Sequence, residues 1–359
     1  MRAIHYFNPE NDMALAYGGA NYTPTPQAAQ LKCDLALLPA WLAESGDGVV
    51  CDDERHAEWL SRQGLGVDAV PSGQLQNLQN CRIVPWGWSL PVRNVLLRKG
   101  VDACRLPSET MLTHWRELSH RRLTIAIHRR LKELLGKTLA PMPTELSSIE
   151  DVRAWAKEHP RGFLKMPWSG SGQGVYQALD VNDDYLWKWV GGALRRQQSL
   201  LCEPPLDVLM DFAVEMNCLE GKTHVTGYSV FESDRHKQYA CGVVDGQKEL
   251  RGMIEAQYPQ LPVVEQALVT VLNELVAPHY AGVLGVDMLL YRVGAAQVGI
   301  DPCVEVNLRT TMGMVTAALG EKHGLRGRFV IEKVDSDFVP SGHLLTPHLP
   351  DTRYVAMVL

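Results

Sequence analysis

Short apolar runs alternate with helix-like segments over residues 1–105. Mostly apolar runs, which are typical of buried strands, cover residues 3–7, 48–51, 67–70 and 82–85. The segments 26–44, 53–63 and 91–99 have helical patterns instead. Alternation of this kind indicates a parallel sheet with helices on both faces. We therefore expect residues 1–105 to form an α/β domain.

Beyond residue 105 the pattern changes, and strand begins to follow strand. Predicted helices cover residues 119–135, 183–196 and 262–277, and a further helix begins after Ser148. Predicted strands cover residues 163–166, 175–179, 200–202, 208–219, 224–231, 239–244, 282–291 and 297–307. Successive strands predict a mixed α+β region that is largely antiparallel. We divide it into a helical linker and small lobe, residues 106–200, and a large lobe, residues 201–359.

Composition and charge narrow the class of protein. The 359 residues are 46% hydrophobic and 21% charged, as expected of a soluble globular chain, and the formal net charge is −6. Mild acidity argues against a nucleic-acid partner, and no apolar run approaches the ~20 residues of a membrane helix. The first residues are too short and polar for a signal peptide, so we expect a cytoplasmic protein. Eight scattered cysteines favour free thiols over zinc ligands.

The segment 163–175 carries the strongest chemical signal. A short strand ends in Lys165, and a loop of small residues follows: Ser169, Gly170, Ser171, Gly172, Gln173 and Gly174. Backbone N–H groups in such a loop can close on an anion, and the lysine adds a positive charge for the same phosphate. The β-forming residues after Gly174 exclude a dinucleotide fingerprint, and the absence of Lys-Ser/Thr there excludes a P-loop. An ordinary glycine-rich hairpin turn is the alternative.

A second signal lies on the last two long strands. Asp287 sits within one strand, and Glu305 and Asn307 leave the same face of the next because they are two residues apart. If the strands pair around the turn near Gly294, Asp287 lies about opposite Glu305. Two carboxylates and an amide oxygen suit Mg²⁺, although half-buried strands also carry polar residues on their solvent side. Arg309 follows, and could neutralise a carboxylate or hold a phosphate.

These two signals together resemble the ATP-grasp superfamily, which includes D-alanine–D-alanine ligase, glutathione synthetase and biotin carboxylase. The resemblance covers roughly residues 119–315. It implies an ATP-grasp fold, combining α/β and α+β parts, with residues 1–105 as the N-terminal parallel-sheet domain. The small lobe would then carry the phosphate loop, and the large lobe would carry the metal-binding strands.

The resemblance also implies roles for residues. Lys165 would contact the α- and β-phosphates of ATP, and the loop Ser169–Gly174 would cover the β- and γ-phosphates. Adenine would bind to backbone at the hinge, and an acid on the following strand would hold the ribose. The hinge residues are Leu201, Cys202 and Glu203, and the acid is Asp211. Asp287, Glu305 and Asn307 would bind two Mg²⁺ ions, with Arg309 at the transferred phosphoryl group.

This sequence departs from the family at two points. The family usually has a lysine at the start of the helix that precedes the small lobe, where this chain has Arg121 and Arg122. Either arginine could replace the lysine, or both could be surface charges. The glycine after the Glu-x-Asn segment is delayed to Gly313.

The implied activity is ligation of a carboxylate to an amine, in small molecules or peptides, through an acyl phosphate, with ATP and Mg²⁺ as cofactors. A nucleotide-binding protein without turnover and a kinase that stops at the phosphorylated product are the alternatives. A homodimer is left open as the assembly. The segments 8–12 and 86–88 could contact the acceptor substrate. Alternatively, residues 8–12 could form only a turn, and residues 86–88 could pack in the core or between domains.

Overall fold

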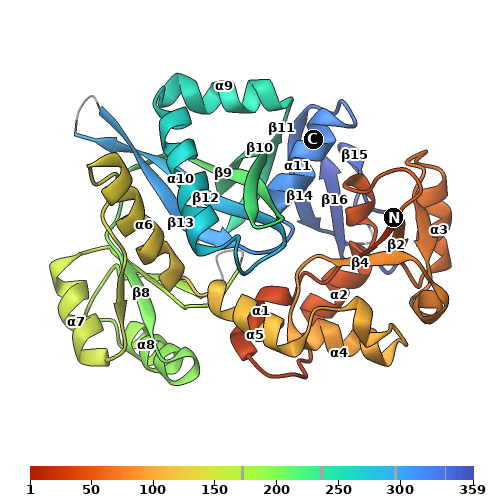
Figure 1. The fold of residues 1–359 in the computed structure, drawn as a ribbon, viewed down its shortest axis with the longest axis horizontal. Coiled ribbons are helices and arrows are strands. Elements are labelled where there is room, and N and C mark those ends of the chain that lie inside the picture. The colour runs from red at the N-terminus through yellow and green to blue at the C-terminus, as the bar shows by residue number, and fades with distance from the viewer. Residues whose placement is uncertain (171–173, 235–237, 295–296, 336) are drawn as a thin grey trace. The chain divides into compact units, whose positions relative to one another are not determined.

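The computed structural model describes residues 1–359 except 171–173, 235–237, 295–296 and 336 (Figure 1). The chain divides into two compact units. The first unit comprises residues 1–116, 240–247 and 309–359, and the second comprises residues 117–239 and 248–308. Each unit is therefore built from separate stretches of the sequence.

A parallel sheet organises the first part of the first unit, as the sequence predicts. Its strands are β1 (Arg2–Tyr6), β2 (Gly48–Val50), β3 (Asp68–Val70) and β4 (Cys81–Pro85), in the order β3-β2-β1-β4. The helices are α1 (Asn11–Tyr17), α2 (Pro26–Asp34), α3 (Glu54–Ser61) and α4 (Leu90–Arg98), with short 3₁₀ turns at Leu38–Trp41, Ser72–Asn77 and Ala103–Arg105. Fully buried Ile4, Leu75 and Leu96 belong to its core.

The end of the chain completes this unit with antiparallel strands. They are β11 (Tyr239–Val244), β14 (Gly327–Lys333), β15 (His343–Leu344) and β16 (Tyr354–Val358), and the helix α11 (Met312–Glu321) precedes β14. β14 pairs with β11 and with β16, and β16 pairs with β15. The sequence pattern did not predict α11, β15 or β16.

The predicted helix over residues 26–44 is wrong in its length. α2 ends at Asp34, and a separate 3₁₀ turn covers Leu38–Trp41. Pro39 lies within that turn and has no N–H to donate, so an α-helix cannot continue through it without losing a hydrogen bond.

The second unit contains two antiparallel sheets. The smaller has the order β5-β8-β6-β7 and consists of β5 (Thr144–Leu146), β6 (Phe163–Lys165), β7 (Val175–Gln177) and β8 (Leu200–Glu203). The strands of the larger sheet that belong to this unit have the order β13-β12-β9-β10; they are β9 (Val208–Leu219), β10 (Lys222–Ser233), β12 (Gly282–Val293) and β13 (Gln297–Asn307). The helices are α6 (Arg122–Leu135), α7 (Ile149–Glu158), α8 (Asp184–Gln197) and α10 (Leu261–Leu275). The helices α5 (Glu109–Leu118) and α9 (Gln247–Gln257) each cross a boundary between the units and were not predicted.

Local sequence sets the ends of the helices that surround the smaller sheet. Ser148 accepts a hydrogen bond from the Asp151 N–H at the start of α7, and Asp183 accepts one from the Tyr185 N–H at the start of α8. Gly136 ends α6 with φ = 66°, a left-handed conformation that favours glycine. The start of α7 after Ser148 agrees with the sequence prediction.

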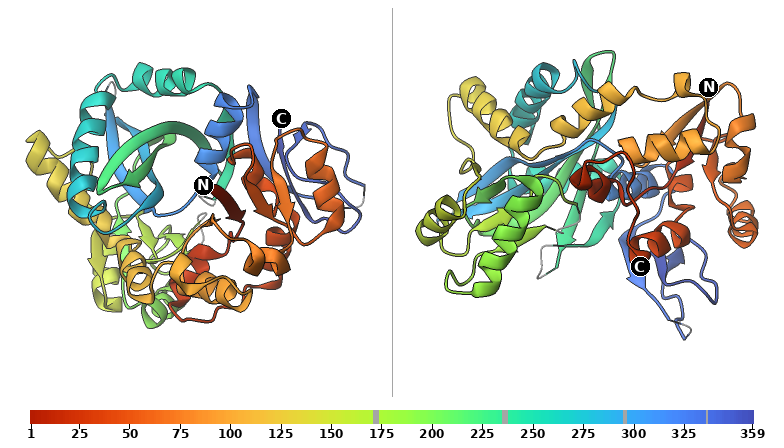
Figure 2. Two further views of the ribbon diagram at one scale, coloured as in Figure 1. Left: turned by 45° about the vertical axis from the view of Figure 1, so that its right-hand side comes forward. Right: turned by 90° about the horizontal axis from the view of Figure 1, so that it is seen from below.

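The larger sheet has one apolar face and one polar face. α6 packs beside α10, with α6 against β13 and α10 against β10 (Figures 1 and 2). Fully buried Phe212 and Val214 alternate along β9 with Asp211 and Glu215, as side chains of a strand must. The acids therefore share the face opposite the apolar one.

Candidate functional site

The hairpin of β12 and β13 brings the predicted metal ligands together. Asp287 is paired directly with Glu305, as the sequence predicts, and Gly285 is paired with Asn307. The Asn307 Nδ2 donates a hydrogen bond to Asp287 Oδ2 over 3.1 Å. The three side chains therefore lie on one face of the hairpin.

Glu215 is a candidate site residue that the sequence pattern did not reveal to us. It is paired with Gly285 on the neighbouring strand, so it stands in the same row as Asn307. It is only 1% exposed, and Ser229 Oγ donates a hydrogen bond to its Oε1 over 2.9 Å. The period of two from Asp211 through Ala213 to Glu215 is the signal that could have found it.

The predicted phosphate loop begins at the end of β6. β6 pairs with β7 on one side and with β8 on the other, and Lys165 forms an ion pair with Glu203 of β8. The Met166 N–H donates to the Gly174 carbonyl over 2.8 Å, which closes the base of the loop. Gly174 has φ = 77°, and a Cβ there would lie 2.8 Å from Ser169 Cβ. Ser171, Gly172 and Gln173 lie outside the described residues.

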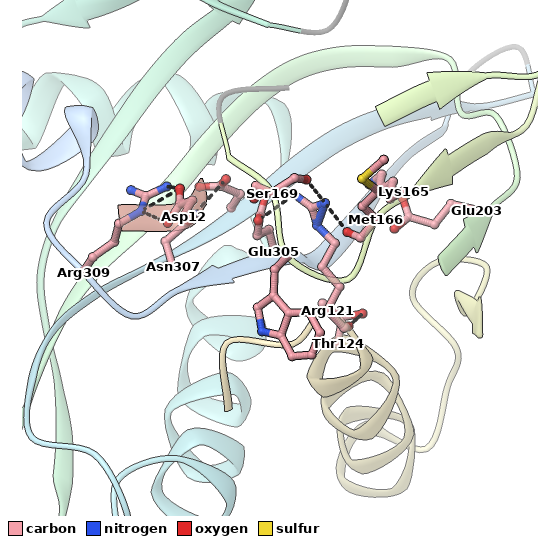
Figure 3. Close-up of polar contacts among 12 residues, drawn as sticks. Asp12, Arg121, Thr124, Lys165, Met166, Ser169, Glu203, Glu305, Asn307 and Arg309 are labelled. Carbon is pink, nitrogen blue, oxygen red and sulfur yellow. Dashed lines mark hydrogen bonds and ion pairs between the residues drawn. The ribbon is translucent and has the colours of Figure 1, made fainter. Parts of the chain in front are cut away.

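Arg121 connects this loop to the hairpin. Its Nη1 donates to the Met166 carbonyl over 3.1 Å and to Ser169 Oγ over 2.9 Å. Its Nη2 donates to the Ser169 carbonyl over 3.3 Å and to Glu305 Oε1 over 2.6 Å (Figure 3). The Arg121 side chain is only 4% exposed. The loop base and a predicted metal ligand therefore contact the same guanidinium.

The backbone at the loop base is held from two further directions. The Arg121 N–H donates to the Pro167 carbonyl over 3.1 Å. The buried Gln197 side chain accepts from the Trp168 N–H over 2.9 Å and donates to the Trp168 carbonyl over 3.1 Å. These contacts fix residues 166–169 against the first turn of α6 and the end of α8.

Arg122 has a different environment from Arg121. Its side chain is 55% exposed and lies 3.3 Å from Glu145, and its Nη2 lies 2.8 Å from His120 Nε2. Of the two arginines that the sequence could not separate, Arg121 is the one that contacts the described residues of the predicted phosphate loop.

Comparison with solved structures identifies the fold. Biotin carboxylase of Campylobacter jejuni, solved with β,γ-ATP, matches with a TM-score of 0.54 at 12% identity, covering 100% of this chain and 87% of that one. The biotin carboxylase domain of Hydrogenobacter thermophilus 2-oxoglutarate carboxylase, solved with MgADP, ADP and bicarbonate, matches with a TM-score of 0.52 at 13% identity, covering 91% and 83%. Both are ATP-grasp enzymes.

The chain has the ATP-grasp fold. Identities this low establish the fold alone. No protein-family model matches the sequence, and the search of curated proteins finds no match.

The predicted hinge of the ATP-grasp fold lies on β8. Leu201 and Cys202 are fully buried, and burial raises the pKa of the Cys202 thiol to about 12. Their side chains therefore pack in the interior. The backbone of Leu201 and Cys202 is paired with β5 on one side and with β6 on the other, whereas Glu203 at the end of β8 is paired with Phe163 of β6. Asp211, the predicted ribose acid, accepts a hydrogen bond from Ser233 Oγ over 3.4 Å.

Arg309 belongs to the first unit, where it forms a bidentate ion pair with Asp12. Its Nε lies 2.9 Å from Asp12 Oδ1, and its Nη2 lies 2.7 Å from Oδ2. The backbone beside it contacts the segment 86–88, because Arg309 bridges Gly87 and the Thr310 N–H donates to the Trp86 carbonyl. Asn8 Nδ2 in turn donates to the Gly87 carbonyl over 2.9 Å. The segments 8–12 and 86–88 therefore meet next to Arg309.

The donor chemistry of the hairpin fits magnesium. Among the described residues, no group of three or more His, Cys, Asp or Glu side chains could hold a metal ion. Asp287, Glu305 and Asn307 combine two carboxylates with one amide, and such oxygen donors suit a hard cation that also takes phosphate oxygens.

The described part of the chain contains no helix of the length and apolar character needed to span a membrane.

Proposed function

We propose that this chain is an ATP- and Mg²⁺-dependent ligase that joins a carboxylate to an amine through an acyl phosphate. The contact of Arg121 with both Ser169 and Glu305 is the observation that carries the proposal. Phosphoryl transfer needs a phosphate loop and metal ligands that are neighbours, and the proximity of the predicted loop base to a predicted metal ligand supports the proposal. The ATP-grasp fold supports the same activity.

The roles of the nucleotide-binding residues follow from their surroundings. Lys165 and Arg121 would bind phosphate oxygens at the loop base, together with N–H groups of the loop. Backbone groups of Leu201, Cys202 and Glu203 would bind adenine, and Asp211 would bind the ribose.

Asp287, Glu305 and Asn307 would hold two magnesium ions, with Glu305 shared between them. When bound, magnesium would neutralise the negative charge that develops on the phosphates during transfer. Arg309 would neutralise the transferred phosphoryl group, which requires it to leave Asp12.

The reaction needs no nucleophilic side chain from the protein. A carboxylate oxygen of the substrate attacks the γ-phosphorus, and the bond from that phosphorus to the β,γ-bridging oxygen breaks, so ADP leaves. The amine then attacks the acyl carbon, phosphate leaves with the C–O electron pair, and the amine loses a proton. The chain contributes positioning and fixed positive charge at Lys165, Arg121 and Arg309.

Hydroxylamine trapping tests this proposal. The chain is incubated with ATP, Mg²⁺ and pools of candidate carboxylates, with hydroxylamine as the nucleophile. A ligase yields a hydroxamate together with ADP, and Glu305→Gln yields neither. A kinase that phosphorylates a hydroxyl yields ADP without hydroxamate, and a binding protein yields no ADP in any pool. Either of those two results contradicts the proposal.

Assembly and location complete the proposal. We also propose a cytoplasmic location, with a homodimer as the candidate assembly. Sedimentation at several protein concentrations tests the assembly, and fractionation of the source cells tests the location.

A further inference from the structure

Arg121 is a buried cation with two kinds of partner. Through Nη1 and Nη2 it contacts the loop base at Met166 and Ser169, and through Nη2 it also contacts the Glu305 carboxylate. Glu305 itself is 21% exposed, so the pair lies at the edge of accessible space rather than deep in the core. The planar guanidinium can serve both partners at once because its donors point in several directions.

The ion pair sets a condition on metal binding. A guanidinium stays positive at all ordinary pH values, and a buried charge that loses its partner is strongly unfavourable. A divalent cation on Glu305 would compete with Arg121 for the same carboxylate and would repel it. An anion beside the loop removes this conflict, because Arg121 can then move from Glu305 to a phosphate oxygen.

We infer that Arg121 is a positioning residue that makes cation binding at Glu305 depend on an anion at the phosphate loop. In the ligand-free chain it neutralises Glu305 and holds Ser169. In the loaded chain it pairs with phosphate and leaves Glu305 to the metal. The site therefore favours a metal–nucleotide complex over the metal alone, and this inference rests on the proposed function.

Thermodynamic linkage between metal binding and ADP binding makes the inference measurable. If ADP tightens metal binding by some factor, the metal must tighten ADP binding by the same factor. Part of this factor comes from direct contact between metal and phosphate, and would survive without Arg121. The remainder comes from the exchange of partners at Arg121, and would be lost with that side chain.

The test compares the wild-type chain with Arg121→Gln and Arg122→Gln. Binding of Mn²⁺ alone is followed by its electron paramagnetic resonance signal, and binding of ADP with and without Mn²⁺ is followed by calorimetry. We expect Arg121→Gln to bind Mn²⁺ alone at least fivefold more tightly than the wild type, and ADP alone at least tenfold more weakly. Its coupling factor should fall at least fivefold. Arg122→Gln should match the wild type in all three measurements, since Arg122 pairs with Glu145.

An Arg121→Gln variant that binds Mn²⁺ alone no more tightly than the wild type would overturn the inference. Failure of the proposed function has a different signature, because the wild-type chain itself would then bind no ADP with or without Mn²⁺.

Glu305→Gln provides a second test if Arg121→Gln does not fold. Its Arg121 no longer faces a carboxylate, so ADP alone should bind at least threefold more tightly than to the wild type. Unchanged or weaker binding of ADP alone would contradict the exchange of partners.

Discussion

At the scale of single residues, Lys165 provides the most direct test of nucleotide binding. Lys165→Ala removes one positive charge from the loop base, and a hydrogen bond to a charged group contributes about 1.5–3 kcal/mol, so ATP affinity should fall roughly tenfold to a hundredfold. Titration calorimetry with ATP measures this. Lys188→Ala on the exposed side of α8 is the matched control and should leave affinity unchanged. Near-unchanged affinity of Lys165→Ala would remove the nucleotide function of the loop.

A substitution at Glu305 distinguishes ATP binding from catalytic turnover. Glu305→Gln keeps the shape of the side chain but removes its charge, so the metal would be held poorly while the phosphate contacts of Lys165 remain. In the presence of Mg²⁺ we expect ATP affinity to fall only modestly, within about tenfold, and turnover to be lost. ADP release and ATP binding are measured on the same preparation. Retained turnover would contradict the metal-bridging role.

Single residues also show where sequence reasoning stops. The types of residue at Lys165, Asp287 and Glu305 carry the predicted roles, because phosphate favours a cation and magnesium favours carboxylate oxygens. Arg121 and Arg122 could not be separated, because neighbouring positions on a helix point about 100° apart and only the packed structure decides which one is buried. The pairing of Lys165 with Glu203 and of Arg309 with Asp12 joins residues far apart in the chain, which no local pattern reveals.

At the scale of elements, the start of α7 tests how well a local signal fixes a helix. Ser148 Oγ accepts the Asp151 N–H over 3.0 Å, so Ser148→Ala should lower the free energy of unfolding by about 1 kcal/mol. Chemical denaturation measures this change. Ser147→Ala is the control, because Ser147 is exposed and precedes the cap. An equal cost for both variants would show that the cap contributes nothing specific.

Elements were predicted well where local chemistry defines them and poorly where packing does. The strands β12 and β13 and their register follow from alternation and from a glycine turn, and both agree with the structure. α5, α9 and α11 were missed. α11 is the clearest case, because it has no acidic residue in its first turn and no basic residue in its last turn, so its ends lack the charge signals that reveal a helix; it buries Val315 and Leu319.

At the scale of the whole molecule, chain connectivity limits what sequence reveals. A pattern is read along the chain, but each compact unit combines stretches that lie far apart in sequence. β11 lies far from its partner β14 along the chain, because the paired residues Gly242 and Phe329 are 87 positions apart. The fold class could be predicted because it follows from the order and type of the elements along the chain. Which separate stretches join in one compact unit depends on pairing between distant residues, and a local pattern does not reveal that pairing.

The stability of the second unit should depend on pH through His128 of α6. Its Nε2 lies 3.2 Å from Asp301 Oδ1 and 3.2 Å from the Cys303 carbonyl, so the side chain joins α6 to β13. Burial opposes the charged form, but the hydrogen bond and charge of Asp301 outweigh it and raise the pKa of His128. Because the folded pKa lies above the unfolded value of about 6.5, the stabilisation is fully present below that pH.

This contribution is lost as pH rises through the folded pKa of His128. We therefore expect His128→Gln to lower the free energy of unfolding most at pH 5.5, by about 1.5–3 kcal/mol, which is the scale of a hydrogen bond to a charged group. The cost should shrink towards pH 8.5, where the wild-type histidine is neutral as well. Denaturant unfolding of both chains at a series of pH values measures the difference, and other titrating groups cancel because both chains share them. A difference that stays constant or grows with pH would show that His128 is not charged in the folded chain.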